Sequence, residues 1–468
     1  MRFTSLTFGL FAGALLFLYY RVPGRAQWAV LLLGSLVFYL SAGAEYLPFL
    51  LLAAATTFFA ARFMAKRTEK AAKRRALLLC LLADFGLLAV CKCAGYLPMG
   101  ISFYLFQSAG YVIDVYRGTA KAEGNFLRHA LFVSYFPQLV QGPISRHGQL
   151  EPQLFHSHEY DPKEVSFGIQ RMLWGAFKKL VIADRVAPAV VALKECRGLG
   201  FLLLTVLYAV QIYADFTGGI DIALGLSRCF GITLPENFRS PFRAKNTAEY
   251  WRRWHITLGE WMKDYIFYPV SVSAPMRRLS KAARKRWPKF GKRLPVYAAS
   301  FATWFVTGIW HGVTPNFLVW GLLNCAVIVI SEELTPLYKK FHSRFRLKEK
   351  KWYGGFEITR MFLLMNLIRA CDLFPNVGDY FRRLGSLFTP WTWECALPDL
   401  GLTGLDWAIL ALGVALMLGL GQLRDIQETL WQRPALRYCL LFLLFLAVLL
   451  LGKYGVGYDA AAFIYNQF

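Results

Sequence analysis

Apolar stretches recur along almost the whole chain, from residue 5 to residue 451, and this recurrence limits the possible folds more than any other feature. Hydrophobic residues fill 56% of the 468 positions, more than a soluble domain usually carries. Segments this long and apolar are typical of membrane-spanning helices. The sequence therefore predicts an all-α polytopic membrane protein, and we interpret residues 1–468 as a single integral membrane domain.

The predicted membrane helices alternate with turns and polar loops. The first, at residues 4–20, has only Arg2 before it and no small-residue cleavage site, so we expect a retained helix rather than a signal peptide. Residues 129–144 are too short and broken to span, and we predict a re-entrant segment. The predicted helices cover residues 6–20, 26–42, 46–65, 76–94, 99–115, 165–193, 199–226, 294–312, 316–332, 358–371, 405–420 and 437–452.

The formal net charge of +24 comes largely from basic residues that cluster between the apolar segments. The clusters lie at residues 66–75, 277–293 and 339–351, and we interpret them as loops. Because Lys and Arg accumulate on the cytoplasmic side of membrane proteins, the pattern predicts cytoplasmic loops and an external N-terminus. It favours a lipid bilayer over nucleic acid as the partner, with anionic lipid heads or a phosphorylated cofactor as further possible contacts.

One histidine stands inside the stretch FATWFVTGIWHGVTPNFLVW, at residues 301–320. An ionisable group in so apolar a segment is costly to bury and indicates a functional site. His311 is flanked by Trp310 and Gly312, and histidine suits proton transfer near neutral pH. The alternative is a histidine that is hydrogen-bonded inside a helix bundle. The two predicted helices on either side of it form a hairpin with His311 near the bend.

A second histidine, His255, lies in the stretch NTAEYWRRWHITLGEWM. We predict one continuous helix here with Thr247 as its N-cap. Its apolar residues recur at spacings of three and four, which indicates an interfacial helix with one aromatic face. A plain membrane anchor explains the tryptophans but explains less well a histidine on the buried face. That face carries Trp251, Trp254, His255, Leu258, Trp261 and Met262.

Other polar groups allow a different class of function. Asp84, Asp215 and Asp221 fall in apolar segments and need partners, for which Arg and Tyr are the expected types. Such carboxylates would suit a proton-coupled transporter, but no internal repeat of the transporter kind is found. His156 and His158 form an HxH pair that either binds metal or lies in a solvated loop, and we favour the loop. The sequence contains no P-loop, GxSxG or HExxH motif.

Several blocks resemble the membrane-bound O-acyltransferase (MBOAT) family, in particular the branch of bacterial alginate O-acetyltransferases and D-alanyl transfer proteins. The blocks WRRWH and WHG carry the most specific likeness, and FIYNQF at the C-terminal end extends it. The resemblance implies an MBOAT-type bundle of about a dozen helices, with re-entrant and interfacial helices and a core at about residues 95–335. The other matching blocks are YFPQLVQGPISR (135–146), QIYADFTGGIDIALG (211–225), LPENFRSPF (234–242), EYWRRWHITLGEWMKDYIFYPV (249–270) and TGIWHGVTPNFLVWG (307–321).

The resemblance also implies site residues. The family's invariant histidine matches His311 and its second functional histidine matches His255, so we predict both as catalytic, with His311 as the base. No metal site and no tightly bound cofactor are expected. We assign substrate binding to residues in and beside these blocks, namely Trp254, Trp310, Asn316, Arg252, Arg253 and Asp264.

The implied reaction takes an acyl group from a cytoplasmic thioester, with acetyl-CoA as the expected donor, toward hydroxyls of a cell-surface polysaccharide. The implied location is the bacterial cell membrane, and an extracytoplasmic acyltransferase is the implied partner. The stretch YPVSVSAPMRR lacks the glycine pair common in the alginate branch, so the polymer is not identified. D-alanyl transfer to teichoic acid is the alternative chemistry. A scaffold that only anchors a partner enzyme is a third hypothesis.

Overall fold

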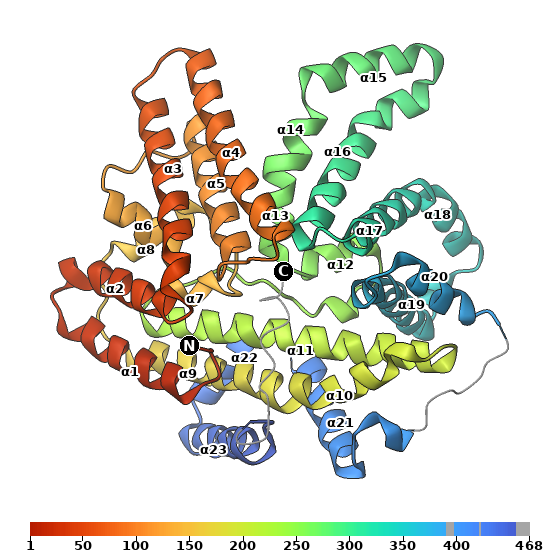
Figure 1. Ribbon diagram of the computed structural model, residues 1–468. Coiled ribbons are helices and arrows are strands. Elements are labelled where there is room, and N and C mark those ends of the chain that lie inside the picture. Colours follow the sequence, from red (N-terminus) through yellow and green to blue (C-terminus); the bar gives the residue numbers. More distant parts are fainter. Residues whose placement is uncertain (390–396, 421–422, 455–468) are drawn as a thin grey trace. The chain divides into compact units, whose positions relative to one another are not determined.

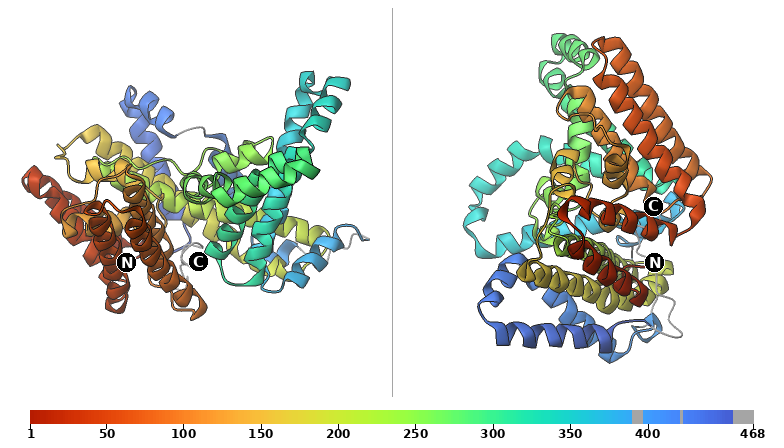
Figure 2. Two further views of the ribbon diagram at one scale, coloured as in Figure 1. Left: turned by 90° about the horizontal axis from the view of Figure 1, so that it is seen from above. Right: turned by 90° about the vertical axis from the view of Figure 1, so that its left-hand side faces the viewer.

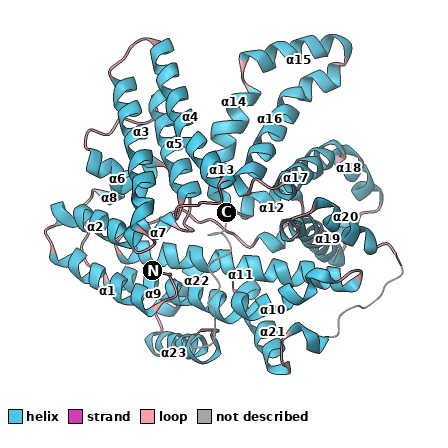
Figure 3. Ribbon diagram, in the orientation of Figure 1, coloured by secondary structure: helices cyan, strands magenta, loops and turns pink. Residues whose placement is uncertain are grey.

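A computed structural model describes residues 1–389, 397–420 and 423–454 of the chain. Over this part the ordered elements are helices, and the β structure is a single isolated antiparallel bridge between Phe238 and Trp254 (Figure 3). The all-α prediction is therefore confirmed. The C-terminal FIYNQF block lies outside the described residues.

Within the described residues, five helices are long and apolar enough to cross a membrane, which confirms a multi-pass membrane protein. The same part of the chain contains three shorter apolar helices, at Leu6–Arg21, Gly24–Leu40 and Gly404–Gly419. The predicted helices are found close to their predicted bounds, although several are divided into shorter pieces. The five long helices are Ala44–Ala65, Lys70–Cys93, Leu199–Cys229, Pro315–Glu333 and Pro434–Leu451.

The chain forms two compact units, each made from separate stretches of sequence. Of the described residues, the first unit contains 1–185, 212–236, 413–420 and 423–454, and the second contains 186–211, 237–389 and 397–412. The assignment of one domain to residues 1–468 stays a prediction.

In the first unit, α3 (Leu47–Ala65), α4 (Lys70–Cys93) and α5 (Ile101–Arg117) pack side by side (Figures 1 and 2). Gly100 joins α4 to α5 with a φ of 73°, in the left-handed region that favours glycine. A Cβ atom there would lie 2.2 Å from the carbonyl oxygen of Leu139. The structure therefore confirms two separate helices, as predicted at residues 76–94 and 99–115, and a side chain at position 100 would collide with the chain at Leu139.

The segment predicted as re-entrant is broken, as its sequence indicates. It contains α6 (Phe126–Ser134) and the one-turn α7 (Phe136–Leu139), followed by irregular chain as far as α8 (His147–Leu154). Every residue from 129 to 145 is buried. Irregular backbone at membrane depth is tolerated where protein surrounds it, and this burial meets that condition. Its re-entrant path through the membrane stays a prediction.

Two buried carboxylates of the first unit, Asp215 and Asp221, have basic partners. The predicted helix at 165–193 is α9 (Pro162–Phe177), a π-helical turn (Lys178–Ala183) and α10 (Asp184–Ala192). Lys179 Nζ lies 2.7 Å from Asp215 Oδ1 and 2.9 Å from Asp184 Oδ1. Asp221 accepts from Lys178 and Arg171. The expected arginine partner is found at Asp221, and lysines take the place of the expected tyrosine at Asp215 and Asp221. Asp84 instead accepts from the hydroxyl of Thr56 at 2.7 Å.

Replacing Lys179 with methionine should destabilise the protein strongly. The side chains of Lys179, Asp184 and Asp215 are at most 3% exposed, and the variant would leave two buried carboxylates without this cation. Removing one partner of a buried ion pair typically costs about 3–5 kcal/mol. Thermal unfolding in detergent would measure the loss.

The matched control is Lys163→Met. The Lys163–Glu428 pair is 2.8 Å long but much more exposed, at 36% and 45%, so its loss should change the melting temperature little. Adding Asp215→Asn to Lys179→Met should recover part of the stability. Equal melting temperatures for the two single variants would contradict a stabilising role for the buried group.

In the second unit, the interpretation of the basic clusters as loops is wrong. Residues 277–293 lie in α15 (Ala274–Arg286) and the start of α16 (Pro288–His311), and α18 (Thr335–Arg344) covers much of 339–351. Likewise, α4 begins at Lys70 within the 66–75 cluster. Lys, Arg and Ala are good helix formers, which explains why these polar stretches are helical.

The predicted hairpin around His311 is confirmed as α16 and α17 (Pro315–Glu333). The two helices pack closely because glycines face each other. A Cβ atom on Gly308 would lie 2.8 Å from the carbonyl oxygen of Phe317, and one on Gly321 would lie 2.5 Å from that of Trp304. Small residues of this kind let membrane helices approach. The hairpin fixes the position of His311 at its bend.

Candidate active site

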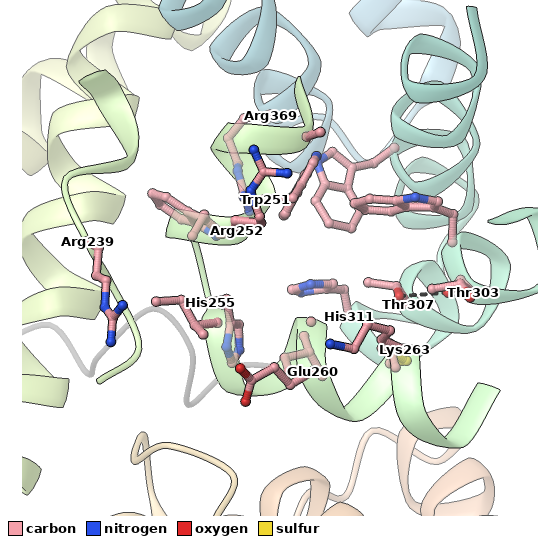
Figure 4. A pocket seen from close by; sticks show the side chains of 18 residues that line it. Arg239, Trp251, Arg252, His255, Glu260, Lys263, Thr303, Thr307, His311 and Arg369 are labelled. Atoms are coloured by element: carbon pink, nitrogen blue, oxygen red, sulfur yellow. Dashed lines mark hydrogen bonds between the residues drawn. The ribbon is translucent and has the colours of Figure 1, made fainter. Parts of the chain in front are cut away.

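A cavity of about 470 Å³ lies within the second unit, and both predicted catalytic histidines line it (Figure 4). We call it the histidine cavity. Its walls come from α12 (Thr247–Arg253), α13 (Ile256–Met262) and α16, together with Trp320 of α17 and Arg369 of α19 (Lys351–Arg369). Its size falls within the usual range for small-molecule sites.

His311 is the last residue of α16 and is 5% exposed. Its ring centroid lies 4.8 Å from that of Trp310 and 4.7 Å from that of Trp320, both in edge-to-face geometry. Gly312 follows in an extended conformation, and a Cβ atom there would overlap the ring of Phe317. Aromatic rings therefore hold the imidazole at the cavity wall.

His255 stands at a break between two helices, so the prediction of one continuous helix is wrong. Helix α12 ends at Arg253, α13 begins at Ile256, and His255 has a φ of 46° and a ψ of 54°. Left-handed backbone is unusual for a residue other than glycine, and such outliers gather at functional sites. The predicted N-cap is also displaced by one residue. Asn246 caps α12 by accepting from the backbone N–H of Glu249 at 2.9 Å.

Asn237 supports this break. Its side-chain oxygen accepts from the backbone N–H and the hydroxyl of Thr257, each at 3.0 Å, and its backbone oxygen accepts from Ile256. The same side-chain oxygen lies 3.3 Å from Nδ1 of His255. An amide oxygen only accepts, so Nδ1–H donates and the lone pair of the neutral imidazole lies on Nε2. Asn237 was missed at the sequence level, although it lies within the LPENFRSPF block.

His255 is buried at 3% exposure, and burial lowers its pKa to about 3, with a further lowering by the positive charge of Arg369. The imidazole is therefore neutral at physiological pH. A neutral imidazole can accept a proton or a hydrogen bond from a substrate hydroxyl.

Tryptophans connect the polar groups of the cavity. The Trp310 ring contacts both histidines, at 6.0 Å from His255 and 4.8 Å from His311. Trp254 stacks on Tyr250 with centroids 5.8 Å apart, and Trp251 lies 4.6 Å from Trp304. These aromatic contacts fix the orientation of the imidazoles, which suits positioned acid–base chemistry.

The predicted substrate-binding residues divide into two groups. Arg252 and Trp254 line the cavity with the two histidines, whereas Trp310, Asn316, Arg253 and Asp264 do not. Asn316 bonds the backbone of Cys371, Arg253 pairs with Glu249 at 2.6 Å, and Asp264 lies in the π-helical turn that follows α13. Residues that line the cavity but were not predicted include Arg239, Glu260, Lys263 and Arg369.

The HxH pair lies away from any group able to hold a metal. His158 Nδ1 is 2.9 Å from the hydroxyl of Tyr19, and its backbone N–H donates to Gln27. Over residues 1–389, 397–420 and 423–454, no three His, Cys, Asp or Glu side chains form a metal-binding group. The structure thus gives His158 hydrogen-bonding partners within the protein.

The fold is that of an all-helical membrane protein with two histidines at one cavity, and sequence comparison identifies the class to which it belongs. The model of the MBOAT, membrane-bound O-acyltransferase family matches residues 119–284. A probable alginate O-acetylase of Pseudomonas fluorescens is 32% identical over 442 residues, which are 91% of this chain and 82% of that protein. The chain belongs to the membrane-bound O-acyltransferase family.

Other relatives carry different acceptors in their names. A peptidoglycan O-acetyltransferase of Helicobacter pylori is 30% identical over 67% of this chain and 66% of its own length. A teichoic acid D-alanyltransferase of Bacillus subtilis is 27% identical over 54% of this chain and 63% of its own length. The chain thus spans about two thirds of the length of these two relatives. The resemblance noted from the WRRWH and WHG blocks is confirmed at the level of the family.

Proposed function

We propose that this protein is an O-acyltransferase that moves an acetyl group from a thioester donor, acetyl-CoA, toward hydroxyls of a cell-surface polysaccharide. The observation that carries the proposal is the convergence of His255 and His311 at the histidine cavity. They are 56 positions apart in sequence and come from different helices, yet both rings contact Trp310. Acyl transfer to a hydroxyl needs a base and a group that stabilises negative charge, and this cavity contains suitable groups for both.

In the proposed reaction, His311 takes the proton of the acceptor hydroxyl as its oxygen forms a bond to the thioester carbonyl carbon. The carbonyl electron pair moves onto the carbonyl oxygen. When that pair returns, the carbon–sulfur bond breaks, and the thiolate leaves and receives the proton from His311. His255, held by Asn237, positions the donor or the acceptor through Nε2.

The charges at the cavity suit an anionic donor. Arg239, Arg252 and Lys263 are exposed residues that line it, against a single acidic lining residue, Glu260. The phosphates of coenzyme A carry negative charge, and exposed lysine and arginine side chains attract such groups. The donor is a substrate in this proposal and not a resident cofactor.

The proposal includes a place and a partner. We place the protein in the bacterial plasma membrane, where it takes the acyl group from the cytoplasm and passes it outward. An extracytoplasmic acyltransferase then completes transfer to the polymer. The basic clusters of α15 and α18 suit the cytoplasmic face.

Mass spectrometry of cell-surface polymers, from cells with and without the gene, tests the proposed function. Loss of ester-linked acetyl groups, restored by the wild-type gene, is the expected result. Identification of the polymer that loses acetyl groups would also separate alginate-like polysaccharide from peptidoglycan. Unchanged acetylation of every envelope polymer would overturn the proposal.

Transfer of D-alanine to teichoic acid is the second candidate. The similarity to the Bacillus subtilis teichoic acid D-alanyltransferase favours it, although that match covers less of the chain and has lower identity than the O-acetylase matches. Loss of D-alanyl esters with intact acetyl esters, in the same mass spectra, would select it.

A further inference from the structure

Arg369 is a buried cation at the histidine cavity, and neither the sequence motifs nor the family's histidine pair assigns it a role. It is the last residue of α19, is 3% exposed, and lines the cavity with His255 and His311. Figure 4 shows its guanidinium at the cavity wall, on a different element from either histidine. The predicted helix at residues 358–371 was given no function, so this charge is an addition to the expected site.

Two tryptophans and one carboxylate hold the guanidinium. Its Cζ atom lies 4.9 Å from the ring centroid of Trp254 and 5.1 Å from that of Trp320, and Nη1 lies 3.5 Å from Asp372 Oδ2. Trp320 also contacts the His311 ring, and Trp254 precedes His255 in the chain. These rings therefore fix the cation at the cavity that both imidazoles line.

Packing alone does not explain a charge at this position. Burying a guanidinium removes it from water at a considerable cost in free energy, even where a carboxylate such as that of Asp372 lies close to it. A methionine or leucine would fill the space between the two indoles without that cost. Charges retained in buried sites of membrane proteins therefore indicate function.

We propose that Arg369 donates N–H groups to the oxyanion that forms on the thioester carbonyl when the acceptor oxygen attacks. The inference rests on the proposed acyl transfer, and it adds Arg369 to His311 and His255 as a third residue of that reaction. His311 takes the proton of the acceptor hydroxyl, the new carbon–oxygen bond forms, and the carbonyl electron pair moves onto the oxygen beside the guanidinium. When the carbon–sulfur bond breaks, the pair returns, and the leaving thiolate takes the proton from His311.

The geometry favours this role over binding of the donor phosphates. The exposed Arg239, Arg252 and Lys263 offer positive charge to phosphates, whereas Arg369 is enclosed by aromatic rings beside the histidines. A fixed cation in a water-excluded site stabilises developing charge much better than one in water. The guanidinium should therefore stabilise the transition state more than it stabilises the bound donor.

The test measures kcat, the KM for acetyl-CoA and the melting temperature of the purified Arg369→Gln, Arg369→Met and Arg369→Lys variants. Loss of one oxyanion donor typically lowers kcat by about 10²–10³-fold, and we expect a fall of this order in the glutamine and methionine variants with little change in KM. The Arg369→Lys variant keeps the positive charge but loses the planar guanidinium group, so it should retain more activity than the glutamine and methionine variants. Guanidinium ion added to an Arg369→Ala variant should restore part of the rate.

The matched control is Arg360→Gln. Arg360 lies on the same helix, is exposed, and donates to the backbone oxygen of Lys245. This variant should keep wild-type kcat. An inactive wild-type protein would contradict the proposed function itself. An active wild type with full kcat in Arg369→Met, or a rise in KM alone, would overturn the oxyanion role.

The oxyanion role can still be tested if all the Arg369 variants melt at a lower temperature than the wild type. Rescue by guanidinium ion requires a folded protein with a space for the cation, so rescue supports the role even in a destabilised variant. Failure of rescue in a variant that melts like the wild type would contradict it.

Discussion

Acyl transfer should fall by about 10²–10⁴-fold when His311 is replaced by glutamine, which is the range that positioned acid–base catalysis typically supplies. Glutamine has nearly the same bulk and keeps some hydrogen bonding, but it cannot take a proton. The ring of His311 packs edge-to-face on Trp310 and Trp320, and these contacts give it a fixed orientation at the cavity wall. We expect His311→Ala to be equally inactive.

The measurement is the turnover of purified variants with matched expression and melting temperature. His342 provides the control histidine, because it lies on α18 and its Nε2 contacts the hydroxyl of Tyr353 at 2.7 Å, away from the cavity. His342→Gln should keep full activity. Retention of more than about a tenth of wild-type turnover by His311→Gln, against the range above, would make the histidine an orienting partner and not the base.

The hairpin around His311 could be predicted from the sequence because it depends on local signals. Long apolar runs, prolines at helix starts and the basic stretches on either side all lie within a few residues of the elements that they define. His311 and His255 stand out in the sequence because their surroundings are apolar and aromatic, and the WRRWH and WHG blocks match them to the two histidines of the family. Only that family resemblance implies that both histidines serve one site.

Other features required the structure because they depend on contacts between distant segments. The break at His255 depends on Asn237, 18 positions away, which accepts from both sides of the turn. Arg369 enters the cavity from a helix more than 110 positions beyond His255, so no spacing rule connects them. The lysine partners of Asp215 and Asp221 lie in the π-helical turn at Lys178–Ala183, an irregularity that the spacing of apolar residues does not predict.

A second large loss of activity is expected at His255, where the imidazole and the backbone make separate contributions. The residue has a φ of 46°, which asparagine adopts more readily than alanine. His255→Asn should therefore keep the turn between α12 and α13 while removing the imidazole. His255→Ala removes the imidazole and also strains the turn, at a cost of order 1–3 kcal/mol for a residue held in a sparsely populated conformation.

We expect both variants to lose activity by about 10²-fold, the lower end of what a positioned acid–base group contributes, and only the alanine variant to melt at a lower temperature. His255→Gly supplies the control for the backbone, since glycine adopts this conformation without strain. Because the pKa of His255 is lowered to about 3, its imidazole stays neutral across the assay range. Its loss should therefore lower the plateau of the pH–rate profile without moving the profile near neutral pH. Full activity in the asparagine variant would mean that the break needs only a left-handed residue at this position, and the hydrogen-bonding role of Nε2 would then be wrong.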